Sequence, residues 1–112
     1  MNLATETFGQ VMVVHTPDEL AGDNAAGFLA ALEPTLEAGQ KQMVLEMDRT
    51  EQYDSAGLTV LLDLQDRIRE QGGNVKVSGL NDIGRKIFEV TRLDRRFDLF
   101  DSLIDAVSSF RT

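Results

Sequence analysis

Short runs of β-branched apolar residues alternate along this chain with longer stretches whose apolar residues recur at helical spacing. The short runs predict strands at residues 11–14, 43–47, 75–77 and, more weakly, 3–8 and 99–100. Strands that alternate with helices pair mostly in parallel, through right-handed crossovers. The order β-β-α-β-α-β-α-β-α therefore predicts an α/β fold, with a mixed, mostly parallel sheet of about four to five strands and about four helices. Gly9 is expected to turn the chain between the first two strands, which makes an antiparallel hairpin.

The helical stripes carry their own start and stop signals. Residues that can cap the four helices at their N-termini are Asp23 or Asn24, then Ser55, then Asp82, then Asp101 or Ser102. The third helix is expected to carry an apolar stripe of Ile83, Ile87, Val90 and Leu93. Gly39 and Gly72 are expected to end the first and second helices. Pro34 lies inside the first stripe and predicts a kink or an early end there.

Composition limits the class of protein. A chain of 112 residues fits a single domain over residues 1–112, and the absence of cysteine fits a reducing compartment. The first residues lack the basic and apolar regions of a secretory signal, and no apolar run approaches the ~20 residues of a membrane span. We therefore expect a soluble, cytoplasmic domain. The formal net charge of −8 disfavours nucleic acid as a partner and favours either plain solubility or a partner with a basic patch.

The best candidate site is the loop that follows the predicted strand at residues 43–47, because function in open α/β sheets gathers at the carboxyl ends of strands. This loop enters the second helix at Ser55, whose hydroxyl is expected to cap the helix. A phosphoryl group there would add about −1.5 to −2 charges next to Asp54 and Glu51, at a helix end that tolerates anions. The alternative is that Ser55 is an N-cap and nothing more. Gly57 either reflects tolerance near a helix end or allows another backbone to approach closely.

Enzyme chemistry finds little support in the residues. A Ser55–His15 pair would lack the Gly-x-Ser-x-Gly elbow, and one histidine without cysteine gives a poor metal ligand set. No glycine-rich phosphate loop of either common type is present. We therefore expect no catalytic residues, no metal and no cofactor.

Several motifs resemble one family. Residues 53–58 (YDSAGL), 72–79 (GGNVKVSG), 88–94 (FEVTRLD) and 97–103 (FDLFDSL) together resemble the STAS family, in particular its anti-sigma factor antagonists. The resemblance runs from about residue 11 to residue 110. It implies a fold with helices mainly on one side of the sheet, which agrees with the order of elements above.

The resemblance also implies a function and a site. In that family the serine of the Asp-Ser motif is phosphorylated by a kinase that doubles as an anti-sigma factor, and a serine phosphatase reverses the mark. By match to the motif, Ser55 would be the phosphoacceptor. The residues that would lie on the partner-binding surface with it are Asp54, Ala56, Gly57, Leu58 and Asp23.

Two other functions remain open from the sequence. One is a STAS interaction module of a transporter or a signalling scaffold that is not phosphorylated. The other is a STAS domain that binds a small molecule or a nucleotide.

Overall fold

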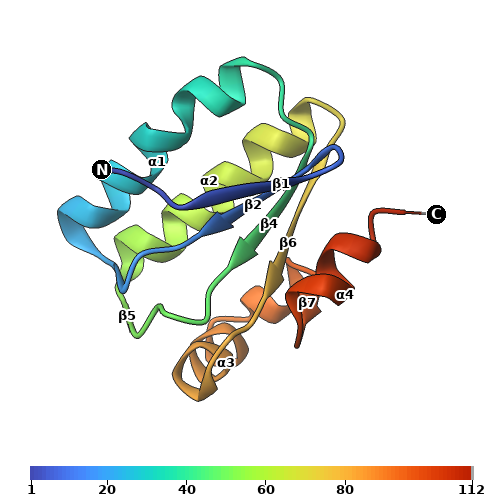
Figure 1. Ribbon diagram of the computed structural model, residues 1–112. Helices are drawn as coiled ribbons and strands as arrows, with labels where there is room; N and C mark the ends of the chain where they lie inside the picture. The colour runs from blue at the N-terminus through green and yellow to red at the C-terminus, as the bar shows by residue number, and fades with distance from the viewer. Residues whose placement is uncertain (112) are drawn as a thin grey trace.

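The computed structural model describes residues 1–111, and its strands and helices follow one another as the sequence pattern predicts, with two short strands and a 3-10 turn in addition (Figure 1). The elements are β1 (Thr5–Phe8), β2 (Val11–His15), β3 (Glu19–Leu20), α1 (Gly22–Glu37), β4 (Gln42–Glu46), β5 (Gln52–Tyr53), α2 (Ser55–Glu70), β6 (Asn74–Ser78), α3 (Asp82–Val90), the 3-10 turn η1 (Leu93–Arg95), β7 (Leu99–Phe100) and α4 (Leu103–Ser108).

Five strands form the main sheet, in the order β1-β2-β4-β6-β7. β1 pairs with β2 in an antiparallel hairpin, and Gly9 turns the chain between them with φ of 61°. The other neighbours pair in parallel. The predicted fold class, a mixed and mostly parallel sheet with four helices, is confirmed.

The sheet carries a different layer on each face. α1 and α2 cover one face, where Phe28 and Leu61 pack against Leu45 and Val77 in the main core. α4 lies on the other face, where Ala106 packs with a smaller apolar cluster that includes Val44. Side chains of a strand alternate between faces, so β4 contributes Leu45 to one layer and Val44 to the other. No helix within residues 1–111 is long and apolar enough to span a membrane.

Two short strands were not predicted. β3 and β5 form a separate parallel pair, with Glu19 opposite Gln52 and Leu20 opposite Tyr53. Each is two residues long, too short for alternation of apolar and polar residues to reveal it. The pair ties the loop before α1 to the loop before α2.

Several capping predictions are corrected by the structure. Neither Asp23 nor Asn24 caps α1, because the helix begins at Gly22 and its N-cap position holds Ala21, which offers no side-chain acceptor. α3 is capped by Asn81 rather than Asp82, and its side chain accepts a hydrogen bond from the Gly84 N–H at 2.8 Å. The expected cap of α4 by Ser102 is confirmed.

The predicted helix ends agree better with the structure. Gly39 and Gly72 follow α1 and α2 with φ of 86° and 84°, in the left-handed region that favours glycine. Pro34 does not end α1, which continues to Glu37. The Pro34 residue is exposed, and its carbonyl accepts a hydrogen bond from the Ala38 N–H.

The apolar stripe predicted for α3 is only partly the face that packs. Its last member, Leu93, lies beyond α3 in η1 and is buried in the main core. Gly84 and Phe88 are buried, whereas Ile83 is 51% exposed and Val90 is 64% exposed.

α3 packs against η1, and Gly84 of α3 lies beside the Tyr53 hydroxyl. The phenyl ring of Phe88 packs near that of Phe97, with ring centroids 6.1 Å apart. Glycine at position 84 escapes a search for apolar periodicity because it has no side chain.

Candidate functional site

Ser55 is the first residue of α2 and is exposed at the edge of the sheet where the parallel strands end (Figure 1). The prediction that Ser55 caps the helix is wrong. The N-cap is Asp54, which has extended dihedral angles and whose Oδ1 accepts a hydrogen bond from the Gly57 N–H at 3.0 Å. Aspartate and serine cap helices about equally well, so the sequence alone does not choose between adjacent candidates. The capping function of this turn therefore belongs to Asp54, not to the Ser55 hydroxyl.

The second oxygen of Asp54 reaches another helix. Its Oδ2 accepts a hydrogen bond from the Gly22 N–H, the first residue of α1, at 2.9 Å. Hydrogen bonds from the Gly57 and Gly22 N–H groups lower the pKa of the Asp54 carboxyl below its usual range. Figure 1 shows α1 and α2 starting at the same end of the molecule. The Asp54 carboxylate accepts a hydrogen bond from a backbone N–H in the first turn of each helix.

The structure places the other predicted site residues as follows. Asp23 and Ala56 are exposed in the first turns of α1 and α2, respectively. Leu58 is half-buried and packs against the main core. Gly57 is buried against β3. The Asp54 link to Gly22 brings the Asp23 turn next to the Ser55 turn.

A buried threonine supports the loop that leads to Ser55. The Thr50 hydroxyl donates to the Pro17 carbonyl at 2.7 Å and lies 2.6 Å from the Thr16 hydroxyl. The Asn81 side chain donates to the Thr50 carbonyl at 3.0 Å. The bonds to Pro17 and Thr16 fix the loop between β4 and β5 against the loop after β2, and the bond from Asn81 fixes it against the start of α3. Periodicity does not reveal such a residue, because a threonine in a polar loop looks like any other turn residue.

The two loops around Ser55 carry acidic side chains. Asp18 and Glu19 come from the loop before α1, and their backbones lie beside Glu51 and Gln52 of the loop before α2. Asp23 in the first turn of α1 and Asp54 at the N-cap of α2 add two more acidic side chains. The surface around Ser55 is thus predominantly anionic.

Tyr53 is a residue that the sequence analysis missed. It is half-buried in β5, and its hydroxyl is buried without a hydrogen-bond partner among the described residues. Burial raises the pKa of Tyr53 to about 12. The hydroxyl lies beside Gly84, at 3.0 Å from where a Cβ would stand. Tyr53 therefore connects the Ser55 loop to α3.

The His15 side chain interacts with β1. Its Nε2 lies 2.7 Å from Oε1 of Glu6 on the neighbouring strand β1. Within residues 1–111 no group of three or more histidine, aspartate and glutamate side chains could hold a metal ion.

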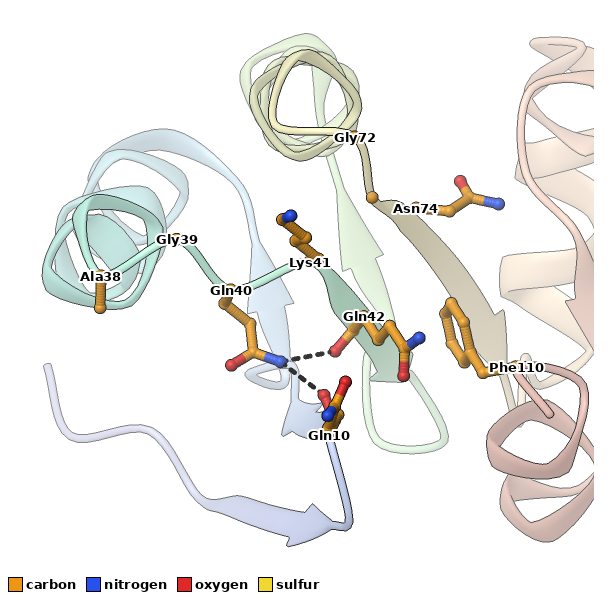
Figure 2. A pocket seen from close by; sticks show the side chains of 10 residues that line it. Gln10, Ala38, Gly39, Gln40, Lys41, Gln42, Gly72, Asn74 and Phe110 are labelled. Atoms are coloured by element: carbon orange, nitrogen blue, oxygen red, sulfur yellow. Dashed lines mark hydrogen bonds between the residues drawn. The ribbon is translucent and has the colours of Figure 1, made fainter.

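A cavity of about 520 Å³ lies at the opposite end of the parallel strands from Ser55. Figure 2 shows its lining, where α1 and α2 end and where β4 and β6 begin. Its polar lining is mostly side-chain amides, from Gln10, Gln40, Gln42 and Asn74, and Phe110 forms one wall. Gln40 is already bonded to the carbonyls of Gln10 and Gln42, both at 2.9 Å. This cavity is separate from the Ser55 surface.

Comparison with known proteins agrees with this fold. The family model of the STAS domain matches residues 2–106, and the chain belongs to that family. BtrV of Bordetella bronchiseptica, a proposed anti-sigma factor antagonist, is 24% identical over 112 residues, covering 100% of this chain and 97% of that protein.

Solved structures share the same fold. The chain is similar to a proposed anti-sigma factor antagonist from Thermotoga maritima, with a TM-score of 0.91 and 23% identity, covering 98% of this chain and 95% of that chain. It is also similar to the anti-sigma factor antagonist SpoIIAA from Bacillus, at 16% identity, in its unphosphorylated and phosphorylated forms. The TM-scores are 0.83 and 0.75, and the matches cover 98% of this chain and 96% or 100% of SpoIIAA.

Proposed function

We propose that this protein is an anti-sigma factor antagonist that binds a serine-kinase anti-sigma factor and is switched by reversible phosphorylation of Ser55. The observation that carries the proposal is the exposed position of Ser55 at the start of α2, next to an aspartate that already caps the helix. A kinase can reach such a hydroxyl without taking a cap away from the helix.

The proposed switch acts through the negative charge around Ser55. A phosphoryl group would add about −1.5 to −2 charges beside Asp54 and Asp23, on a surface that is already anionic. Ala56 and Leu58 provide the apolar part of the same surface. A partner that docks there in the unphosphorylated state would meet charge repulsion and a desolvation penalty once Ser55 is modified. Release of the partner follows from this without any change of fold.

The relatives support the proposal. BtrV and the Thermotoga maritima protein are named as proposed anti-sigma factor antagonists, and SpoIIAA has been solved both with and without its phosphoryl group. In this proposal a serine phosphatase returns Ser55 to its free form. The protein itself acts in the cytoplasm as a binding module and not as an enzyme.

The test is a kinase assay with the serine-kinase anti-sigma factor from the same cell. We expect label on the wild type, none on Ser55→Ala, and undiminished label on Thr59→Ala, which alters an exposed hydroxyl one turn further along α2. We expect Ser55→Asp to bind the kinase more weakly than the wild type does. Equal labelling of the wild type and Ser55→Ala would disprove the assignment of Ser55.

A pull-down from cell extract tests the alternative function, in which the chain is an interaction module of a transporter. Recovery of a membrane transporter in place of a soluble kinase would replace the proposed function with the transporter one.

A further inference from the structure

α1 begins without a capping side chain of its own. Ala21 at its N-cap position has no hydrogen-bond acceptor beyond the backbone, and Gly22 follows with φ of 51°. The first N–H groups of a helix need acceptors from outside it. The Gly22 N–H finds its acceptor in Asp54, which is 32 residues further along the chain. One aspartate therefore serves the N-termini of two helices.

Few side chains can make this link. The two oxygens of the carboxylate accept at the same time, Oδ1 from Gly57 at 3.0 Å and Oδ2 from Gly22 at 2.9 Å. Asparagine has one amide oxygen, so its NH₂ group would face one of these N–H donors. Serine has a single oxygen on a shorter side chain, which cannot point at both helices.

We infer that Asp54 is a positioning residue of the partner-binding surface, whose carboxylate fixes the turn of Asp23 in α1 relative to the turn of Ser55 in α2. This inference rests on the proposed function, because the surface is the one proposed to receive the kinase. Asp54 then contributes through the shape of the surface, in addition to any direct contact with a partner. Loss of one hydrogen bond at this point loosens α1 against α2 while leaving the sheet intact.

The first experiment needs no partner. In an NMR titration from pH 7 downward, we expect the amide resonances of Gly22 and Gly57 to move together, with one shared midpoint below that of an ordinary aspartate. Asp54→Asn should abolish both movements. Glu51→Gln, which removes one charge from the same loop, should leave both in place. A Gly22 amide that does not follow the Gly57 midpoint would overturn the inference.

The second experiment connects the link to binding. We expect Asp54→Asn to lower the affinity for the kinase about tenfold, the scale of one charge-assisted hydrogen bond. Glu51→Gln removes the same charge without touching either helix start, and we expect a loss below about threefold. In Asp54→Asn, resonances of the first turn of α1 should shift or broaden while those of β4 stay unchanged. Equal losses of affinity in the two variants would show that charge, not position, is what Asp54 contributes.

The two experiments test different claims, so a negative result in one does not decide the other. If the wild type binds no kinase, the proposed function fails, and the titration still decides whether Asp54 joins the two helices.

Discussion

The backbone carbonyl of Leu20 lies so close to Gly57 that no side chain fits between β3 and α2. A Cβ at position 57 would stand 2.7 Å from the carbonyl carbon of Leu20, and closer still to its oxygen. Of the two interpretations of Gly57 that the sequence allows, the structure shows the close approach of another backbone. Glycine here lets β3 lie against the first turn of α2, next to Ser55.

Gly57→Ala is therefore expected to destabilise the protein by about 3 kcal/mol, because overlap with a backbone group outweighs the better helix propensity of alanine. Urea denaturation measures the loss. Gly27→Ala is the matched control in α1, where a Cβ would make an ordinary contact at 3.5 Å with Met1. It should stabilise the protein by about 0.5–1 kcal/mol. Similar effects of the two substitutions would contradict the close approach.

Tyr53 should make stability depend on alkaline pH. Its pKa of about 12 exceeds the usual 10.0, so the folded state holds the proton more tightly than the unfolded state does. The stabilisation that results from this raised pKa is fully present below pH 10 and is lost as the pH rises toward 12. The free energy of unfolding of the wild type should therefore fall relative to that of Tyr53→Phe in this range. Below pH 10 we expect Tyr53→Phe to gain about 1 kcal/mol, because it removes a buried hydroxyl without a partner.

The titration of Tyr53 can be followed directly. The chain has one tyrosine and no tryptophan, so absorbance of phenolate reports this residue alone. A midpoint near 10 in the folded protein would contradict the burial of the hydroxyl.

The two faces of α3 should respond in opposite ways to substitution. Phe88→Ala should cost about 3–5 kcal/mol, because the ring is fully buried. Val90→Ala, on the exposed face, should change the free energy of unfolding by less than about 0.5 kcal/mol. Thermal or urea unfolding distinguishes the two. A large loss for Val90→Ala would mean that the face predicted from the sequence stripe is the packed one.

Thr50→Val tests the support of the Ser55 loop. The substitution keeps the shape but removes the hydroxyl that donates to the Pro17 carbonyl and contacts the Thr16 hydroxyl. We expect a loss of about 1–3 kcal/mol, the cost of leaving buried polar groups unpaired. Hydrogen exchange should increase at Glu51, whose N–H bonds to Asp18 across the same two loops. Unchanged exchange at Glu51 would show that the loop does not depend on Thr50.

Much of the fold could be predicted because apolar residues that recur at regular spacing along a segment indicate which face of that segment is buried. The stripes of α1 and α2 and the short runs of β2, β4 and β6 define the sheet and its main layer. The two-residue strands β3 and β5 could not be predicted, since their pairing depends on loops brought together by the rest of the fold.

The position in the fold of the loop that carries the candidate site could be predicted from the sequence, but the contacts within that loop could not. The loop before α2 follows from the rule that sites lie at the carboxyl ends of parallel strands. The division of roles between Asp54 and Ser55 did not follow, because adjacent residues compete for the N-cap and only three-dimensional geometry decides. Long-range bonds such as Gly22 to Asp54, and Asn81 to Thr50, leave no periodic trace in the sequence.

The pairing of β3 with β5 runs from backbone to backbone, so the exposed side chains at Glu19 and Gln52 are not needed to hold the two loops together. Substitutions at these two positions can therefore change the charge of this surface while the contour around Ser55 is kept.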